Sequence, residues 1–240
     1  MKIIFFKTAA LFAAFSTPLA SGCARNEDKP GNGIQAVKPL DINVKKAIDE
    51  KRKIVEQKER DFAKELGGLA SSSLPNVLLD LYMVSDSEND ILKARDIAFK
   101  LVKRSDEFIE LTRNDYLIKK PDEEQLEAFH RVISMTQKGT LYTWTFSTME
   151  AKEITEKFKT YLNKNEPELK GEELKKRVDH TLECFTVYQE DLRNVHKLRD
   201  DLYKLMKSFN DDAKKIDQPS YNPVWGLSLE KIQDIRIFVH

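Results

Sequence analysis

Apolar residues recur at intervals of three and four along most of this 240-residue chain, which is the period of an amphipathic α-helix. The longest pattern has ten steps over 35 residues, a mean spacing of 3.5. Such a seam is typical of a helix packed lengthwise against others, as in a coiled coil or a long helical bundle. A helix of about 40 residues would be about 60 Å long, so we expect an elongated domain. The seam consists of Leu174, Val178, Leu182, Phe185, Tyr188, Leu192, Val195, Leu198, Leu202, Leu205 and Phe209.

Four shorter patterns predict further helices, each bounded by glycine, proline or a capping sequence. Gly67-Gly68 is expected to close the first of them. Ser85 and Glu88 fit a capping box for the third, and the acids at 122–124 favour the start of the fourth because the helix dipole is positive there. The expected extents are about Asp41 to Leu66, Pro75 to Met83, Ser85 to Asn114 and Asp122 to Gly139.

These patterns predict an all-α fold, an elongated bundle of long antiparallel helices. We expect the bundle to span residues 41–217, preceded by a flexible N-terminal tether over 23–40. Residues 218–240 form a C-terminal tail with enough apolar residues to pack on the bundle, either as a short helix or as a strand from Ser228 to Val239.

One segment departs from the helical period. Residues 142–147 alternate aromatic and hydroxyl side chains, which is the pattern of a half-buried strand. A single strand would have no partner in a helical chain, and a two-stranded sheet is marginally stable. We therefore favour a helix through 141–148, with a strand as the open alternative.

The first 22 residues have the layout of a secretory signal peptide. They contain no acid, Lys2 and Lys7 supply positive charge, and an apolar stretch from Thr8 to Phe15 is followed by small residues up to Gly22. This stretch is too short to span about 30 Å of hydrocarbon. We therefore expect residues 1–22 to be cleaved.

The segment Leu19-Ala20-Ser21-Gly22-Cys23 resembles the lipobox of bacterial lipoproteins. The resemblance implies cleavage between Gly22 and Cys23, a diacylglycerol on the Cys23 sulfur and acyl chains such as palmitate. The commonest lipobox has leucine where this chain has Ala20. The alternative is an ordinary secreted protein, in which Cys23 could form a disulfide with Cys184.

The residues that follow Cys23 suit an anchor. Residues 24–33 are polar, with proline and glycine, as in a flexible tether. Residues 24–38 could reach about 50 Å if extended, and two or three acyl chains hold a protein stably on a bilayer. In lipoproteins of bacteria with two membranes, a residue other than Asp after the cysteine, here Ala24, points to the outer membrane.

The charge balance bears on partners. The chain has 40 Lys and Arg against 40 Asp and Glu, whereas a nucleic-acid binder normally carries basic excess. We expect no nucleic-acid partner. Removal of residues 1–22 takes away two lysines and no acid, so the mature chain carries two more acids than bases.

Candidate chemistry is sparse. Glu127 and His130 form a Glu-x-x-His, which is half of the motif pair in four-helix di-iron proteins, but the residues three before His180 and His196 are arginines. His180 and Cys184 share a helix face, and zinc would need two more ligands. We expect no metal or cofactor and no catalysis, with a metal-binding helical-bundle enzyme around His130 as the less favoured alternative.

The remaining hypothesis is protein binding. Aromatic residues dominate interface hot spots, and the candidate contact patch consists of Tyr142, Trp144, Phe146, Tyr221 and Trp225, with core packing of these residues as the other interpretation. We expect a lipid-anchored envelope or surface lipoprotein that acts as a protein-binding or adhesion module. Its partner would be a host ligand if the chain faces outward, or an envelope component if it is a periplasm-facing structural adaptor.

Overall fold

The computed structural model describes residues 42–85, 87–113, 120–144 and 151–237. They belong to one compact unit, Leu40–His240. Every regular element in the described residues is helical, which confirms the predicted all-α class. The expected signal peptide, Cys23 and the tether lie outside the described residues. The elements are α1 (Ile42–Gly68), the π-helix η1 (Leu69–Ser73), α2 (Leu74–Val84), α3 (Glu88–Thr112), α4 (Glu123–Trp144), α5 (Ala151–Asn165), α6 (Gly171–Lys215) and α7 (Leu229–Asp234).

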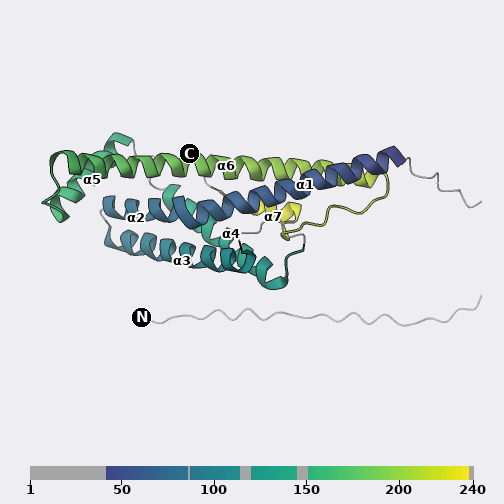
Figure 1. Cartoon of the computed structure of the whole chain (residues 1–240), viewed down its shortest axis with the longest axis horizontal. Coiled ribbons are helices and arrows are strands. Elements are labelled where there is room, and N and C mark those ends of the chain that lie inside the picture. The colour runs from purple at the N-terminus through teal and green to yellow at the C-terminus, as the bar shows by residue number, and fades with distance from the viewer. Residues whose placement is uncertain (1–41, 86, 114–119, 145–150, 238–240) are drawn as a thin grey trace, which may run out of the picture. The chain divides into compact units, whose positions relative to one another are not determined.

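The longest helix, α6, has 45 residues and is therefore about 68 Å long at 1.5 Å per residue. Helices α1 and α2 run antiparallel to it (Figure 1). Lys51, near the start of α1, forms an ion pair of 2.5 Å with Asp212 near the end of α6. Residues at the end of α2 instead lie against residues 181–185, near the start of α6. The prediction of long antiparallel helices is thus confirmed.

Helix α1 ends at Gly68, as predicted, although the helical course of the chain does not break there. Gly68 has helical angles, φ −60° and ψ −49°, and the chain continues through the π-turn η1 into α2. There the Leu74 amide donates to the Leu69 carbonyl, five residues earlier. Pro75 follows directly. In a regular α-helix its ring would clash with the carbonyl of Ser71, and the wider π-turn relieves that crowding.

Helix α3 begins two residues later than the predicted capping box implies. Its N-cap is Ser87, whose hydroxyl accepts a hydrogen bond from the Asp90 amide at 3.3 Å. Ser85 instead accepts from the Ser87 amide at 3.2 Å. The helix ends at Thr112, and its C-cap residue Arg113 adopts a left-handed conformation with φ 50°, which is common where a helix terminates.

Helix α4 runs past Gly139, where the sequence predicted its end, to Trp144. A Cβ atom on Gly139 would lie 2.9 Å from Leu74 Cδ2 and 3.1 Å from Leu101 Cδ1. This glycine therefore serves close packing of α4 against α2 and α3. The first part of the ambiguous segment, residues 142–144, is helical as favoured, and residues 145–148 lie outside the described residues.

Helix α5 was not predicted. It packs against α2 and α6 through three buried apolar residues, Ile154, Phe158 and Leu162. Their spacing of four places them on one face of the helix. The helix closes one end of the bundle beside the start of α6 (Figure 1).

The C-terminal segment packs into the bundle core. Trp225 is completely buried, and its ring lies 5.5 Å from that of Phe108 and 5.2 Å from that of Phe129. Leu227 and Ile232 are also buried. Ser228 caps α7 by accepting from the Lys231 amide. One core therefore joins α3, α4 and the segment after α6.

Candidate functional site

The five aromatic residues proposed from the sequence as a contact patch do not gather on one exposed surface. Trp225 is fully buried and Tyr221 is 7% exposed. Trp144 is 48% exposed, whereas Tyr142 is half-buried and its hydroxyl donates to the Asp90 carbonyl at 2.6 Å. Phe146 lies outside the described residues. Core packing therefore accounts for Tyr221 and Trp225, and the five do not form a patch in the described structure.

Tyr221 and Trp225 are held by a buried acid on α1, Glu59, which has no exposed surface. Its carboxylate accepts from the Tyr221 hydroxyl at 2.9 Å, from the Val224 amide at 2.9 Å and from the Trp225 amide at 2.7 Å. Burial raises the pKa of Glu59, and these donors act to lower it. Three donors supply the pairing that a buried carboxylate requires.

A second attachment fixes the segment near its end. The Arg199 guanidinium on α6 donates to the Ile235 carbonyl at 2.7 Å and to the Asp200 carboxylate at 2.6 Å. Gln137 on α4 donates to the Asp234 carbonyl at 3.1 Å. The C-terminal segment thus bridges α1, α4 and α6.

His130 lies under this segment rather than in a metal site. A Cβ atom on Gly226 would be 3.5 Å from two atoms of its ring. Burial, and to a smaller extent the charge of Lys231, lowers the pKa of His130, whereas a hydrogen bond with the Trp225 backbone acts to raise it. Glu127 lies 3.6 Å from Arg131. The described residues contain no group of three His, Cys, Asp or Glu side chains placed to hold a metal ion.

His180 and Cys184 face one another on α6, with 3.8 Å between Nε2 and Sγ. Burial raises the pKa of the Cys184 thiol, and Asp80 and Glu183 raise it further, against an opposing effect of Arg177. A nucleophilic cysteine requires a lowered pKa, because the thiolate is the reactive form. The surroundings of Cys184 therefore favour an unreactive thiol.

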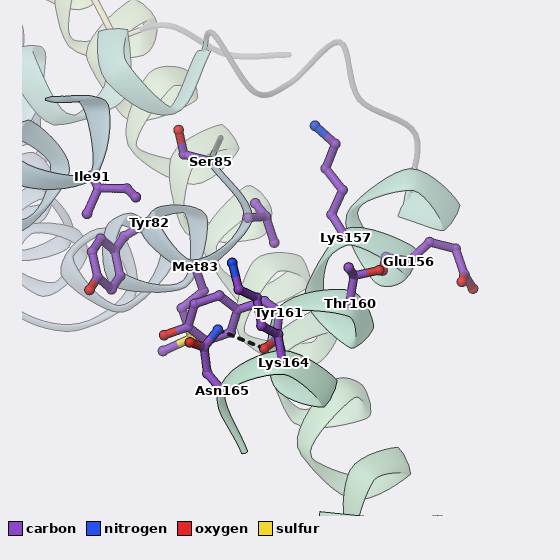
Figure 2. Close-up of a pocket in the computed structure, with 11 residues that line it drawn as sticks. Tyr82, Met83, Ser85, Ile91, Glu156, Lys157, Thr160, Tyr161, Lys164 and Asn165 are labelled. Atoms are coloured by element: carbon purple, nitrogen blue, oxygen red, sulfur yellow. Dashed lines mark hydrogen bonds between the residues drawn. The ribbon is translucent and has the colours of Figure 1, made fainter. Parts of the chain in front are cut away.

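A groove of about 560 Å³ lies between the end of α2, the start of α3 and the outer face of α5 (Figure 2). Its apolar lining includes the half-buried side chains of Tyr82, Met83, Ile91 and Tyr161. Pockets that bury small ligands or anchoring side chains are typically about 300–1,000 Å³ in volume. The groove is therefore large enough to take side chains from another molecule.

Charged and polar groups of α5 form one side of the groove. Lys157, Lys164 and Glu156 all line it. Glu156 is bound to Lys159 at 3.1 Å and points away from the tyrosines in Figure 2. The Asn165 amide donates to the Tyr161 carbonyl at 2.9 Å. In the part of the chain that the structure describes, no ion pair engages Lys164, so its ammonium group is available to a ligand.

The sequence did not reveal this groove, since one wall of it is the unpredicted helix α5. Tyr161 and Lys164 are three residues apart, which places them on neighbouring positions of one helix face. That spacing was the available signal.

Comparison with known proteins identifies no relative: no protein-family model, no curated protein and no solved structure matches this chain. No helix in the described ranges has both the length and the hydropathy that a membrane crossing would need.

Proposed function

We propose that this chain is an envelope or surface lipoprotein, anchored to the outer membrane through acyl chains on Cys23. The proposal is supported by the lipobox-like segment from Leu19 to Cys23 and by Ala24 after the cysteine. It is also supported by spacing. Sixteen residues separate Cys23 from Leu40, where the compact unit begins, and this length would hold the helices within about 50 Å of the anchoring surface.

The anchored unit acts by binding a protein rather than by catalysis, and the α2–α5 groove is its binding site. The observation that carries this proposal is the combination of half-buried aromatic residues with Lys164, whose ammonium has no ion pair within the described residues. Such a site fits a segment of a partner protein that presents an aromatic or aliphatic side chain next to a carboxylate. The apolar side chain would be buried against Tyr82 and Tyr161, and the carboxylate would pair with Lys164.

The anchor is tested by the mass of the full chain expressed in a bacterium. We expect cleavage before Cys23, with added mass from the lipid and acyl chains. The Cys23→Ser variant should lose this mass and the membrane association. A mature chain that begins elsewhere, or that carries a disulfide between Cys23 and Cys184, would contradict the anchor.

The groove is tested with a library of random displayed peptides. Peptides selected on the wild-type chain should combine an acid with an apolar anchor, and Lys164→Glu should weaken their binding by about tenfold or more. Lys152→Glu is the matched control, since it makes the same charge change at an exposed position of α5 outside the groove. If the selected peptides bind Lys164→Glu as tightly as they bind the wild type, the proposed site is wrong.

The natural partner is a host ligand if the unit is displayed outward and an envelope component if it faces the periplasm. Proteolysis of intact cells separates the two, because only an outward-facing unit is cleaved. Stoichiometric iron, manganese or zinc in the purified chain would instead favour the metal-binding alternative around His130.

A further inference from the structure

Helix α3 carries apolar side chains on the face opposite its core contacts. Leu92 is 57% exposed, Phe99 is 59% exposed and Val102 is 38% exposed. Their separations of seven and three residues place them on one side of the helix. The buried positions of α3 include Ala94, Ala98 and Leu101, so this apolar side is additional to the one that packs against α2 and α4.

Among the charged residues of this face, two of opposite sign flank Phe99 and Val102 directly. Arg95 precedes Phe99 by four residues, and Asp106 follows Val102 by four. The Arg95 guanidinium lies over the Phe99 ring, 5.5 Å from its centroid. Both charged side chains are exposed, and neither has an ion-pair partner within the described residues.

Six of the other nine charged residues of α3 are paired within the helix. The pairs are Lys93 with Asp90 at 4.0 Å, Lys100 with Asp96 at 2.6 Å, and Arg104 with Glu107 at 2.7 Å. Arg95 and Asp106 are separated by 11 residues, or about 16 Å along the helix. They are therefore too far apart to pair with one another in one chain.

We propose that this face binds α3 of a second copy of the chain, antiparallel, about a two-fold axis midway between Phe99 and Val102. The axis places Phe99 of each copy against Val102 of the other. It also places Arg95 of each copy against Asp106 of the other, so that two ion pairs flank an apolar centre. A two-fold interface is self-complementary in this way. A parallel arrangement would bring like charges together, with Arg95 against Arg95.

A lipid surface is a poorer occupant for this face. Helix α3 contains five basic and six acidic residues, so it lacks the basic excess that attracts an interfacial helix to anionic lipids. The placement of Arg95 and Asp106 on either side of Phe99 and Val102 instead complements an inverted copy of the same face.

The contact is limited to one face of one helix, which is less than the roughly 800 Å² per partner of a standard stable interface. The dimer is therefore weak and reversible in solution. Confinement of both copies to one membrane raises their effective concentration. This last step rests on the proposed anchor at Cys23, whereas the dimer itself does not.

Sedimentation velocity of the full chain in mild detergent tests the proposal, using the Cys23→Ser form so that the result is independent of acylation. The Cys23→Ser chain with an unaltered α3 should form a concentration-dependent dimer. Arg95→Glu and Asp106→Arg should each weaken it by about tenfold or more, because each brings like charges together twice. The double variant with both substitutions should restore it.

The sharpest result comes from mixing the two single variants. In a mixed dimer, the carboxylate introduced at position 95 of one copy meets the guanidinium introduced at position 106 of the other. At the second ion pair, the unaltered Asp106 of the first copy meets the unaltered Arg95 of the second. The equimolar mixture should therefore dimerise where neither variant alone does.

The control is Lys207→Glu, at an exposed position of α6, which should leave the dimer unchanged. If the chain with an unaltered α3 stays monomeric, the proposal is overturned. Single variants that dimerise normally, or a mixture that stays monomeric, would overturn it as well.

Discussion

The Glu59 carboxylate of α1 accepts a hydrogen bond from the hydroxyl of Tyr221, 162 residues later in the chain, at 2.9 Å. Both side chains are buried. This bond and the two backbone amides beside it join the first helix to the last segment, and they explain how a carboxylate can lie in an apolar core.

Loss of this carboxylate should destabilise the bundle strongly. Glu59→Ala would leave the Tyr221 hydroxyl and two backbone amides buried without an acceptor, and we expect a loss of about 3 kcal/mol in the free energy of unfolding. Glu59→Gln keeps one acceptor oxygen and should cost less. Chemical denaturation measures both. Equal stability of Glu59→Ala and the wild type would show that the contacts contribute nothing.

The same residue predicts a pH dependence. Burial raises the pKa of Glu59 above its ordinary value of 4.5, so the native state holds the proton more tightly than the unfolded state. The stabilisation from this difference is fully present below pH 4.5 and is lost as the pH rises through the native pKa. Measured against Glu59→Gln, which does not titrate there, the wild type should lose stability across this range. A parallel course of the two stability curves would contradict the sign.

Gly139 should not tolerate a side chain, whereas Gly68 should. Gly139→Ala brings Cβ within 2.9 Å of Leu74 Cδ2, and we expect a net loss of about 1–2 kcal/mol even after the better helix propensity of alanine. Gly68 is helical, and a Cβ there would meet nothing within 4 Å. Gly68→Ala should therefore stabilise the chain by about 0.5–1 kcal/mol. Thermal melts of the two variants should shift in opposite directions.

Besides Tyr221, whose pKa burial also raises, two tyrosines should resist ionisation. Burial raises the pKa of Tyr188 to about 12, against the opposing effect of its hydrogen bond with Thr143, and burial together with Asp90 raises that of Tyr142 to about 12. Their native states hold the proton more tightly, so this stabilisation is present below about pH 10 and is lost toward about pH 12. In a pH titration followed by tyrosinate absorbance, Tyr188 and Tyr142 should ionise only when the chain unfolds. Tyr188→Phe should remove one such group, and an unchanged titration would contradict the assignment.

The two attachments of the C-terminal segment should be separable. Arg199→Ala removes the donor to the Ile235 carbonyl, so backbone hydrogen exchange should accelerate around residues 229–237. Residues 221–225 should remain protected, because Glu59 still holds them. The reverse pattern is expected in Glu59→Gln. Equal acceleration along the whole segment in both variants would show that it releases as one unit.

The helical class and the antiparallel arrangement followed from periodicity, because burial of a stripe on a long helix leaves a regular spacing. Val178, Leu192 and Phe209 of the predicted seam are indeed buried. The helix ends were predicted less well. Gly139 was interpreted as the end of a helix, but it serves close packing against Leu74 and Leu101, which are distant in sequence.

The buried acid was also missed, although a signal was present. Glu59 lies four residues after Val55 and three before Phe62, so it occupies the apolar face of α1. A charged residue on an apolar helix face is either buried with hydrogen-bond partners or exposed where the packing is interrupted. The sequence alone does not identify the groups that donate to Glu59. The α2–α5 groove requires two segments to meet in space, and periodicity gives no information about that contact.

The attachment of α1 to the C-terminal segment sets an order of events during synthesis. The ribosome adds Tyr221, Val224 and Trp225 only after α6, so the Glu59 carboxylate lacks these donors while the preceding helices emerge. Closure of the core around Glu59 must wait until the segment after α6 has been synthesised, since contacts of high sequence separation form late. A chain that cannot close its core until the segment after α6 appears stays unfolded for longer, which is the state that a secretion channel would require of the exported precursor that we propose.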